Sequence, residues 1–386
     1  MITIRILRWL AVGLLGLVLG AGGQTIKIAS ASPLSGAQAA LGEMVKLGAQ
    51  LAVEEAQASF AVTGLKLELA AQDDQASPDV GVAVAKRIVN DAQILGVVGH
   101  FNSGVAIPAS EVYKDYDLCM VSPANTNPKV TSRRYANINR VCGRDDVQGP
   151  VGAEFAVTEL KSKRVLVIND KTAYGQGVAE AFKGKAAGLG AAVVGFVGTE
   201  EKANFQSLIL QMKVLKPDFV YFGGIYDQGG LLLKQMREKA ITATFMGPDG
   251  LDSSEFVRIA QAAVQGAYYT TVAGPVDQYP AAAEFAKAFA ARFKRTPESF
   301  ALYAYDSANV LIAAIHEVLR QAPGAVPGRA AICAAVRRSH YQGITGLIEF
   351  DDKGDRLKAD YYVVQLKEPT YPGSTVKVIS AGPPAE

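Results

Sequence analysis

The 386-residue chain contains only three cysteines and three histidines, and neither set is clustered along the sequence. Metal sites in proteins usually show closely spaced Cys or His ligands, so no metal site is expected. The chain also lacks a G-x-G-x-x-G turn after its first apolar strand and has no Walker A loop, which argues against a dinucleotide or nucleoside triphosphate. The sequence therefore predicts a protein without a cofactor.

An excess of positive charge is also missing. Without Arg5 and Arg8 the chain carries 37 basic and 37 acidic residues, and it has no basic tract. Neither nucleic acid nor an anionic membrane surface is indicated as a partner, because both select basic patches.

A long run of apolar residues occurs only near the start of the chain. It lies between the basic residues Arg5 and Arg8 and the small residues Ala21 to Gly23. That pattern is typical of a signal peptide, and the run is shorter than the roughly 20 residues that cross a bilayer. We expect residues 1–23 to be cleaved and the remaining 363 residues to be an exported protein, periplasmic where there is an outer membrane.

Three cysteines in an exported chain allow one disulfide and one thiol. Cys119 and Cys142 both flank segments that look extended and adjacent, so we expect them to pair. Cys333 lies at helical spacing among Ala and Ile and is interpreted as a buried apolar residue.

Short β-branched segments alternate with longer amphipathic ones, a pattern typical of βαβ units and parallel sheets. Strands are expected at 26–31, 65–72, 94–100, 118–123, 163–170, 191–198, 217–224, 243–249 and 266–272. Helices are expected at 42–57, 78–91, 106–116, 281–293, 300–321 and 329–338 and between the strands from 163 to 272, and extended segments at 346–350 and 360–367. The strands fall into two series, which indicates an α/β protein with two sheets joined by a tight hinge.

In parallel sheets, loops at the carboxyl ends of strands line the ligand crevice. One such loop holds His100 and Ser103, which could be a catalytic base and nucleophile. The serine has no G-x-S-x-G elbow and no third partner orients the histidine, so a buried structural histidine is favoured over an exported hydrolase.

The same loops offer a set of groups suited to a zwitterion. The Ser103 hydroxyl precedes a helix whose first amides favour a carboxylate. Thr126 adds a hydroxyl in a turn, Tyr174 a phenol, and Asp249 a charge for an ammonium group. Each residue could instead be a cap, a turn or a packing residue, but one ligand between two sheets explains all four.

Order and spacing of "SPLSG", "GHFNSG", "MVSPANTNPKVT", "GRDDVQGP", "VINDKTAYGQG", "DFVYFGG", "FMGPDG" and "FDDKGD" resemble the leucine-isoleucine-valine-binding proteins, periplasmic components of ABC importers. The resemblance covers the whole chain after residue 23. It implies a type I periplasmic-binding-protein fold with two Rossmann-like lobes joined by three crossovers. The first lobe would be 24–144 with 274–348, and the second 145–273 with 349–386.

The resemblance also implies roles at the site. Ser103, the Thr126 backbone and Tyr174 would bind the ligand carboxylate, while the Ala124 carbonyl, the Thr126 hydroxyl and Asp249 would bind the ammonium. The family commonly has Glu where this chain has Asp249.

Aromatic walls of the family's side-chain pocket are replaced by Leu41 and Ile225. Phe101, Tyr226 and the neighbouring Asn102 would complete the pocket.

The sequence thus predicts a non-enzymatic, monomeric receptor for an amino acid, of the branched-chain aliphatic class, that delivers it to a permease in the inner membrane. A receptor of the same fold for another amino acid, an aromatic acid or an amide is the main alternative. A ligand-sensing domain of a larger receptor and an exported hydrolase are less favoured.

Overall fold

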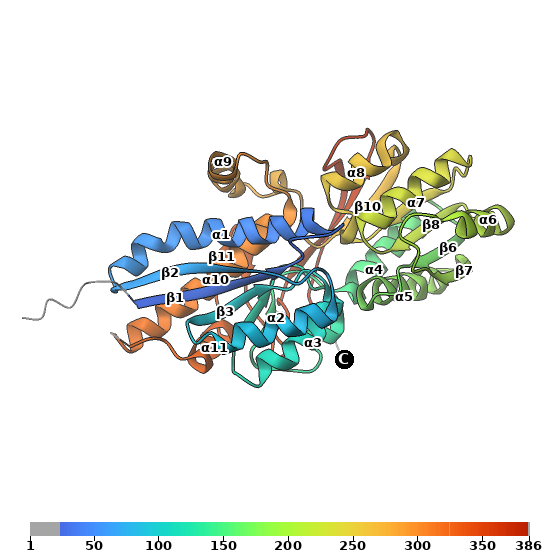
Figure 1. Cartoon of the computed structure of the whole chain (residues 1–386). Helices are drawn as coiled ribbons and strands as arrows, with labels where there is room; N and C mark the ends of the chain where they lie inside the picture. The colour runs from blue at the N-terminus through green and yellow to red at the C-terminus, as the bar shows by residue number, and fades with distance from the viewer. Residues whose placement is uncertain (1–23, 324, 385–386) are drawn as a thin grey trace, which may run out of the picture.

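The computed structural model describes residues 24–323 and 325–384, which form two lobes side by side (Figure 1). The predicted signal peptide lies outside these residues. None of the helices in the described ranges is both long enough and apolar enough to cross a membrane.

The first lobe is built on a parallel sheet of five strands in the order β2-β1-β3-β4-β5. These strands are β1 Gln24–Ser32, β2 Leu65–Asp73, β3 Ile94–Gly99, β4 Cys119–Ser122 and β5 Ile138–Arg140. The helices are α1 Ala39–Ala61, α2 Pro78–Asn90, α3 Ser103–Lys114, α9 Ala282–Phe293, α10 Ser299–Gln321 and α11 Arg329–Arg337.

Both faces of this sheet are buried, because α2 and α3 cover one face and α1, α10 and α11 cover the other. Side chains of successive strand residues alternate between the two resulting cores, as they must in a pleated strand. Met120 packs toward α2 and α3, whereas Cys119 and Val121 belong to the core on the opposite side.

The second lobe contains seven strands in the order β14-β13-β10-β9-β8-β6-β7. They are β6 Arg164–Asn169, β7 Ala192–Gly198, β8 Phe219–Gly223, β9 Thr244–Gly247, β10 Ala267–Thr271, β13 Ala359–Leu366 and β14 Ser374–Ala381. The helices are α4 Asp145–Glu154, α5 Ala173–Gly188, α6 Gln206–Leu215, α7 Tyr226–Glu238 and α8 Ser254–Ala260. Strands β13 and β14 run antiparallel and close one edge.

The prediction of two α/β sheets is confirmed, and each expected strand and helix is present. Helix α4, strand β14 and the short strand at Tyr341–Gly343 were not predicted. Helix α4 contains Gly149 and Pro150, which are poor helix formers. It forms because it packs tightly on α5, where a Cβ atom on Gly149 would lie 2.8 Å from the Val178 carbonyl.

The chain crosses between the lobes three times: after β5, after β10 and after the hairpin of β11 Tyr341–Gly343 and β12 Gly346–Ile348. This agrees with the three crossovers that the family resemblance implies. The exact limits of the lobes stay a prediction.

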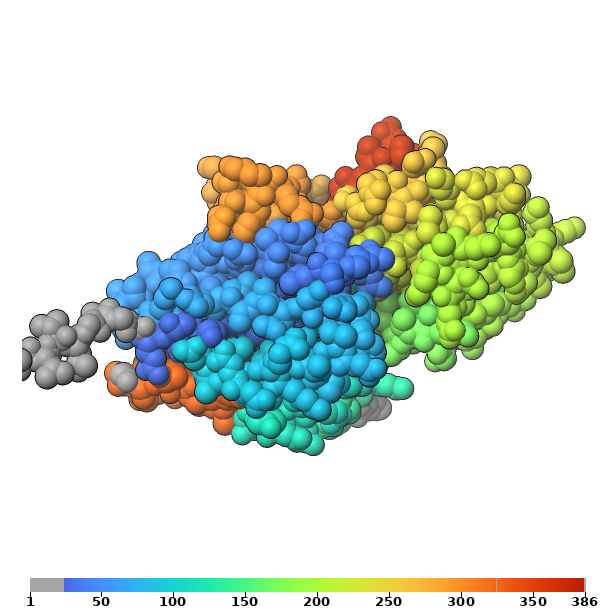
Figure 2. Space-filling view, in the orientation of Figure 1, coloured from blue at the N-terminus to red at the C-terminus, as the bar shows by residue number. Residues whose placement is uncertain are grey.

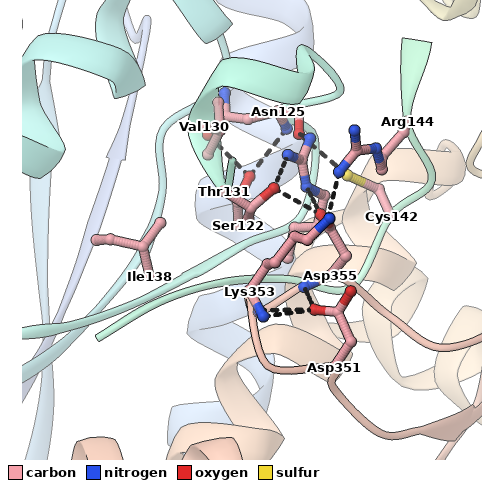
Figure 3. A network of polar contacts seen from close by, with 12 residues as sticks. Ser122, Asn125, Val130, Thr131, Ile138, Cys142, Arg144, Asp351, Lys353 and Asp355 are labelled. Atoms are coloured by element: carbon pink, nitrogen blue, oxygen red, sulfur yellow. Dashed lines mark hydrogen bonds and ion pairs between the residues drawn. The ribbon is translucent and has the colours of Figure 1, made fainter. Parts of the chain in front are cut away.

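A buried ion pair joins the first and third crossovers. The Arg140 guanidinium lies 2.6 Å from the carboxylate of Asp355, and both side chains are almost completely buried. Arg144 and the Thr131 hydroxyl also bind this carboxylate (Figure 3). Burial alone would raise the pKa of Asp355, but the two arginine charges hold it below its usual value.

Replacing Asp355 with alanine is expected to destabilise the protein by about 3–5 kcal/mol, because a buried guanidinium loses its charge partner. Urea unfolding of the purified variant measures this cost. Asp352→Ala is the matched control, since its ion pair with Arg134 is exposed and is expected to contribute about 0–1 kcal/mol. Equal losses for the two variants would contradict a special role for the buried pair.

The expected Cys119–Cys142 disulfide is wrong: all three cysteines are free in the described chain. Strand β4 pairs in parallel with β5 so that Ser122 faces Arg140. Cys119 therefore lies at the amino end of β4 and Cys142 beyond the carboxyl end of β5. Their levels differ by five residues, so at about 3.3 Å per residue they are about 16.5 Å apart along the sheet, well beyond the reach of a disulfide.

Candidate binding site between the lobes

A small cavity lies at the junction of the lobes, whose surfaces meet in Figure 2. Only about 10 Å³ of it is open to the centre of a water molecule, which is room for about one water. Its lining residues come from loops at the carboxyl ends of strands in both sheets: Phe101, Asn102, Ser103, Ala124, Tyr174, Ile225, Asp249 and Gly250. Ligand pockets usually span about 300–1,000 Å³, so a ligand of amino-acid size would need the lobes to move apart to enter this cavity.

The structure brings together seven of the ten residues predicted from the sequence. Leu41, Thr126 and Tyr226 are buried near the cavity but are not among its lining residues. Gly250 was missed, although it directly follows Asp249. A Cβ atom at position 250 would lie 2.4 Å from the Gly224 carbonyl, so only glycine fits this approach of two loops.

The first lobe contributes hydrogen-bond donors and an apolar wall. Ser103 is the first residue of α3, and its hydroxyl accepts a hydrogen bond from the Asn127 amide at 3.3 Å. The first amides of a helix lack partners within the helix and favour an anion. The Phe101 ring stacks edge-on against Phe300, with 5.3 Å between the ring centres.

The second lobe contributes an acidic group held by a phenol. The Tyr174 hydroxyl donates to the Asp249 carboxylate at 2.6 Å and accepts from the Gly250 amide at 2.7 Å. Burial raises the pKa of Asp249 to about 6, although the hydrogen bond from Tyr174 opposes this shift. Asp249 is therefore an ionised but poorly solvated carboxylate at neutral pH.

Asp145, which was not predicted, is a second buried carboxyl group close to Asp249. It occupies the first turn of α4, and its amide donates to the Thr126 carbonyl at 2.9 Å. Neither of its carboxyl oxygens makes a well-formed hydrogen bond within the described ranges, although the Thr126 hydroxyl lies close enough to interact with the carboxyl group. Burial and the nearby Asp249 charge raise the pKa of Asp145 well above its usual value. The signal in the sequence was the pair "DD" at the first crossover, of which only Asp145 is buried.

No basic side chain is among the residues that line the cavity in the described chain. Arg140 is the buried cation nearby, but it is bound to Asp355. The buried Asp249 carboxyl group and the start of α3 thus belong to the same lining, and Asp145 and the Thr126 hydroxyl lie nearby but outside it. The arrangement suits a ligand that carries an ammonium group and a carboxylate.

His100 does not take part in this site. Its ring nitrogens lie 2.7 Å from the Asp74 carboxylate and 2.9 Å from the Tyr113 hydroxyl, and the side chain is completely buried. Both nitrogens are occupied, so His100 has none left to act as a base for Ser103. The interpretation of His100 as a structural residue is confirmed.

A second possible chemistry of the chain is metal binding. Within the described ranges, no three His, Cys, Asp or Glu side chains come together in a manner that could hold a metal ion.

Two hydrogen bonds cross between the lobes beside the cavity. The Tyr226 hydroxyl of α7 donates to the Ala37 carbonyl at 2.7 Å, and the Asn127 side-chain amide donates to the Ala173 carbonyl at 2.6 Å. Tyr226 was predicted as an apolar wall but instead connects the lobes. These contacts join the two lobes directly.

Two α/β lobes whose polar loops meet around a small cavity are the arrangement of a solute-binding protein. The chain belongs to the periplasmic binding protein family, whose model matches residues 25–371. It therefore has the type I periplasmic-binding-protein fold that the sequence motifs implied.

Individual relatives agree with this assignment. An amino acid binding protein of Pseudomonas aeruginosa is 38% identical, over 88% of this chain and 90% of the relative. A leucine-, isoleucine-, valine-, threonine-, and alanine-binding protein of the same organism is 36% identical, over 88% and 90%. The crystal structure of a leucine binding protein from Thermotoga maritima superposes with a TM-score of 0.83 at 28% identity, over 92% of this chain and 98% of that one. These relatives are solute-binding proteins.

The raised pKa of Asp249 predicts how pH affects the unliganded protein. The usual pKa is 3.8, and the folded-state value is about 6, so the folded state holds this proton more tightly than the unfolded state. Protonation of Asp249 therefore adds to the free energy of unfolding. This contribution is fully present below pH 3.8 and is lost as pH rises through about 6. Asp249→Asn lacks this titration.

Urea unfolding of both proteins across this pH range is the measurement. The stability of the wild type relative to Asp249→Asn is expected to fall by on the order of 3 kcal/mol between about pH 4 and pH 8. A difference that does not change with pH would show that Asp249 titrates normally.

Proposed function

We propose that the protein is a non-enzymatic receptor that binds a single α-amino acid between its lobes, of the branched-chain aliphatic class, and delivers it to the membrane permease of an ABC importer. The single observation that carries the proposal is the buried carboxyl group of Asp249, which lines a cavity without a basic side chain among its lining residues and has a second buried carboxyl group, Asp145, nearby. An ammonium group would supply the missing positive charge.

The proposed roles follow from the geometry. The ligand carboxylate would accept hydrogen bonds from the Ser103 hydroxyl and the first amides of α3, where the helix dipole favours an anion. The ammonium would lie between Asp249, Asp145 and the Thr126 hydroxyl. The Ala124 carbonyl, which the family resemblance assigns to the ammonium, belongs to the same lining. An aliphatic side chain would lie against Phe101 and Ile225.

The shorter side chain of Asp249 fits this arrangement. An aspartate reaches one methylene less far than the glutamate common in the family, and Asp145 provides a second acidic group from α4. The pair would hold the ammonium from two directions. Asp145→Asn is therefore proposed to weaken binding, although the sequence resemblance assigned Asp145 no role.

Capture would involve movement of the lobes about the three crossovers. The proposed lobes are residues 24–144 with 274–348 and 145–273 with 349–386. Closure would expel water and bring the donors of one lobe and the acids of the other onto the same ligand. Export by a cleaved signal peptide, a periplasmic location and a monomeric state complete the proposal, supported by the functions of the family.

A thermal-shift screen of the mature protein tests the ligand class. The panel contains the twenty amino acids, aromatic acids and short amides. A ligand at 100 times its dissociation constant adds about 2.7 kcal/mol of stability, so a bound amino acid is expected to raise the midpoint clearly. Shifts produced only by compounds without an α-amine would keep the fold and refute the role of Asp249.

Asp249→Asn is expected to weaken binding by about 2–5 kcal/mol, because a buried ammonium then lacks its charged partner. Wild-type affinity is expected to fall as pH drops through about 6, where Asp249 becomes protonated, and the variant is expected to lack this dependence. Calorimetric titration measures both effects.

Asp252→Asn is the matched control for this experiment. Asp252 is also completely buried, with its pKa raised by burial to about 7, but it binds Thr271 and Tyr371 and does not line the cavity. Its variant is expected to keep the affinity at neutral pH. An equal loss in both variants would show that general damage, not charge pairing, explains the effect.

Tyr226→Phe is expected to weaken ligand binding by about 1 kcal/mol through faster dissociation, because the closed form loses the hydrogen bond to Ala37. Stopped-flow measurement of dissociation tests this. Tyr305→Phe is the control, since the Tyr305 hydroxyl binds Glu55 within the first lobe at 2.6 Å. Unchanged dissociation in Tyr226→Phe would contradict a role in closure.

A further inference from the structure

Two cysteines from distant parts of the chain meet in the core of the first lobe. Cys119 is the first residue of β4 and is completely buried, on the face of the sheet that α10 and α11 cover. Cys333 lies in the middle of α11 and is also buried. The Cys333 thiol lies near enough to Cys119 to raise the pKa of the Cys119 thiol.

Contacts on both sides of this pair fix how α11 lies on the strand. The Cys333 thiol donates to the Asp117 carbonyl at 2.9 Å, two residues before Cys119. One helical turn further, the Arg337 guanidinium donates to the Asn139 side-chain oxygen at 2.8 Å. The Asn139 amide in turn lies 3.5 Å from the Cys119 sulfur.

Cys119 thus lies beside Cys333 and beside Asn139, which Arg337 binds. Cys333 and Arg337 are one turn apart on the same face of α11. This alignment does not depend on a single side-chain rotamer, because it is held by three hydrogen bonds. The third cysteine is elsewhere: the Cys142 sulfur lies 3.7 Å from the Asn125 carbonyl, beyond the carboxyl end of the sheet.

We propose that Cys119 and Cys333 form a disulfide in the exported protein, which fastens α11 to β4. The two thiols lose two protons and two electrons and form one S–S bond. The oxidant is a protein or small-molecule disulfide of the exporting compartment, which is reduced to two thiols by exchange. Disulfides of this kind persist in oxidising compartments outside the cytoplasm. The proposal rests on export and not on the identity of the ligand.

The bond is expected to form during folding. Burial, together with the adjacent Cys333 thiol, raises the pKa of Cys119 well above its usual value. The reactive species in exchange is the thiolate, which is scarce in such an environment. Exchange is therefore expected while the thiols are still accessible, after the chain has left the cytoplasm and before α11 covers the sheet.

The position of the bond predicts its consequence. It joins β4 to a helix that follows the excursion of the chain through the second lobe, so it closes a very long loop and restricts the unfolded chain. It lies at the amino end of β4, whereas the ligand cavity lies at the carboxyl ends of the strands. Stability is expected to depend on the bond, and ligand affinity is not.

Trypsin makes the test direct, because it places each cysteine in a separate peptide: 115–129, 141–144 and 330–337. Protein recovered from the exported compartment is denatured, alkylated without reductant, digested and analysed by mass spectrometry. The expected result is a linked 115–129 and 330–337 pair, two hydrogens lighter than the sum of the free peptides, with 141–144 alkylated. Three alkylated peptides, or a link to 141–144, would overturn the proposal.

Variants separate the bond from general effects on folding. Cys142→Ser is the control and is expected to retain the link, whereas Cys333→Ser should leave 115–129 alkylated. Reduction of the wild-type protein in mild denaturant, followed by alkylation and refolding, tests the consequence without a substitution. It should lower the unfolding midpoint relative to an unreduced sample treated in the same way. An unchanged midpoint would show that no stabilising bond was present.

Discussion

The burial of two acidic groups where two lobes meet is the constraint on which the rest of the site depends. Asp249 is held by the Tyr174 phenol, and Asp145 makes no well-formed hydrogen bond through its carboxyl oxygens within the described chain. Burying acidic groups in this way is costly unless a cation pairs with them. Asp145 avoids this cost through its raised pKa, whereas Asp249 lines a cavity to which the described part of the protein supplies no cation, so a positively charged ligand group is a physically consistent partner for Asp249.

The fold explains how these groups reach one place. Parallel strands end at one edge of each sheet, and both edges face the junction between the lobes. The helix amides beside Ser103 belong to α3, which follows a strand of the first sheet. Asp249 lies in the loop after β9, and Asp145 lies at the start of α4. Arg140 and Asp355 hold two of the three crossovers together behind this junction. Rigid lobes with a defined hinge can present complementary ends of a site to a small zwitterion.

Much of this arrangement could be predicted from the sequence, because each strand of the two series is a short β-branched segment followed by a polar loop. The ligand loops around Ser103, Tyr174 and Asp249 could be found for the same reason. Helix α4 could not, since Gly149 and Pro150 hide its helical character and only packing on α5 reveals it. Asp145 was missed with it, because its burial depends on that helix. The wrong pairing of Cys119 with Cys142 has a similar cause. It assumed that the two cysteines lie opposite each other on adjacent strands, whereas the register of β4 and β5 offsets the two cysteines by several residues.

The most direct test of the account compares one ligand with and without its amine. The amino acid selected by the thermal-shift screen and the corresponding acid that lacks only the α-amino group are titrated calorimetrically into the mature protein at neutral pH. The account predicts that the amino acid binds and that its des-amino analogue does not bind measurably, because Asp249 and Asp145 then face no cation. Comparable affinity for the two compounds would contradict the central role of the buried carboxyl groups.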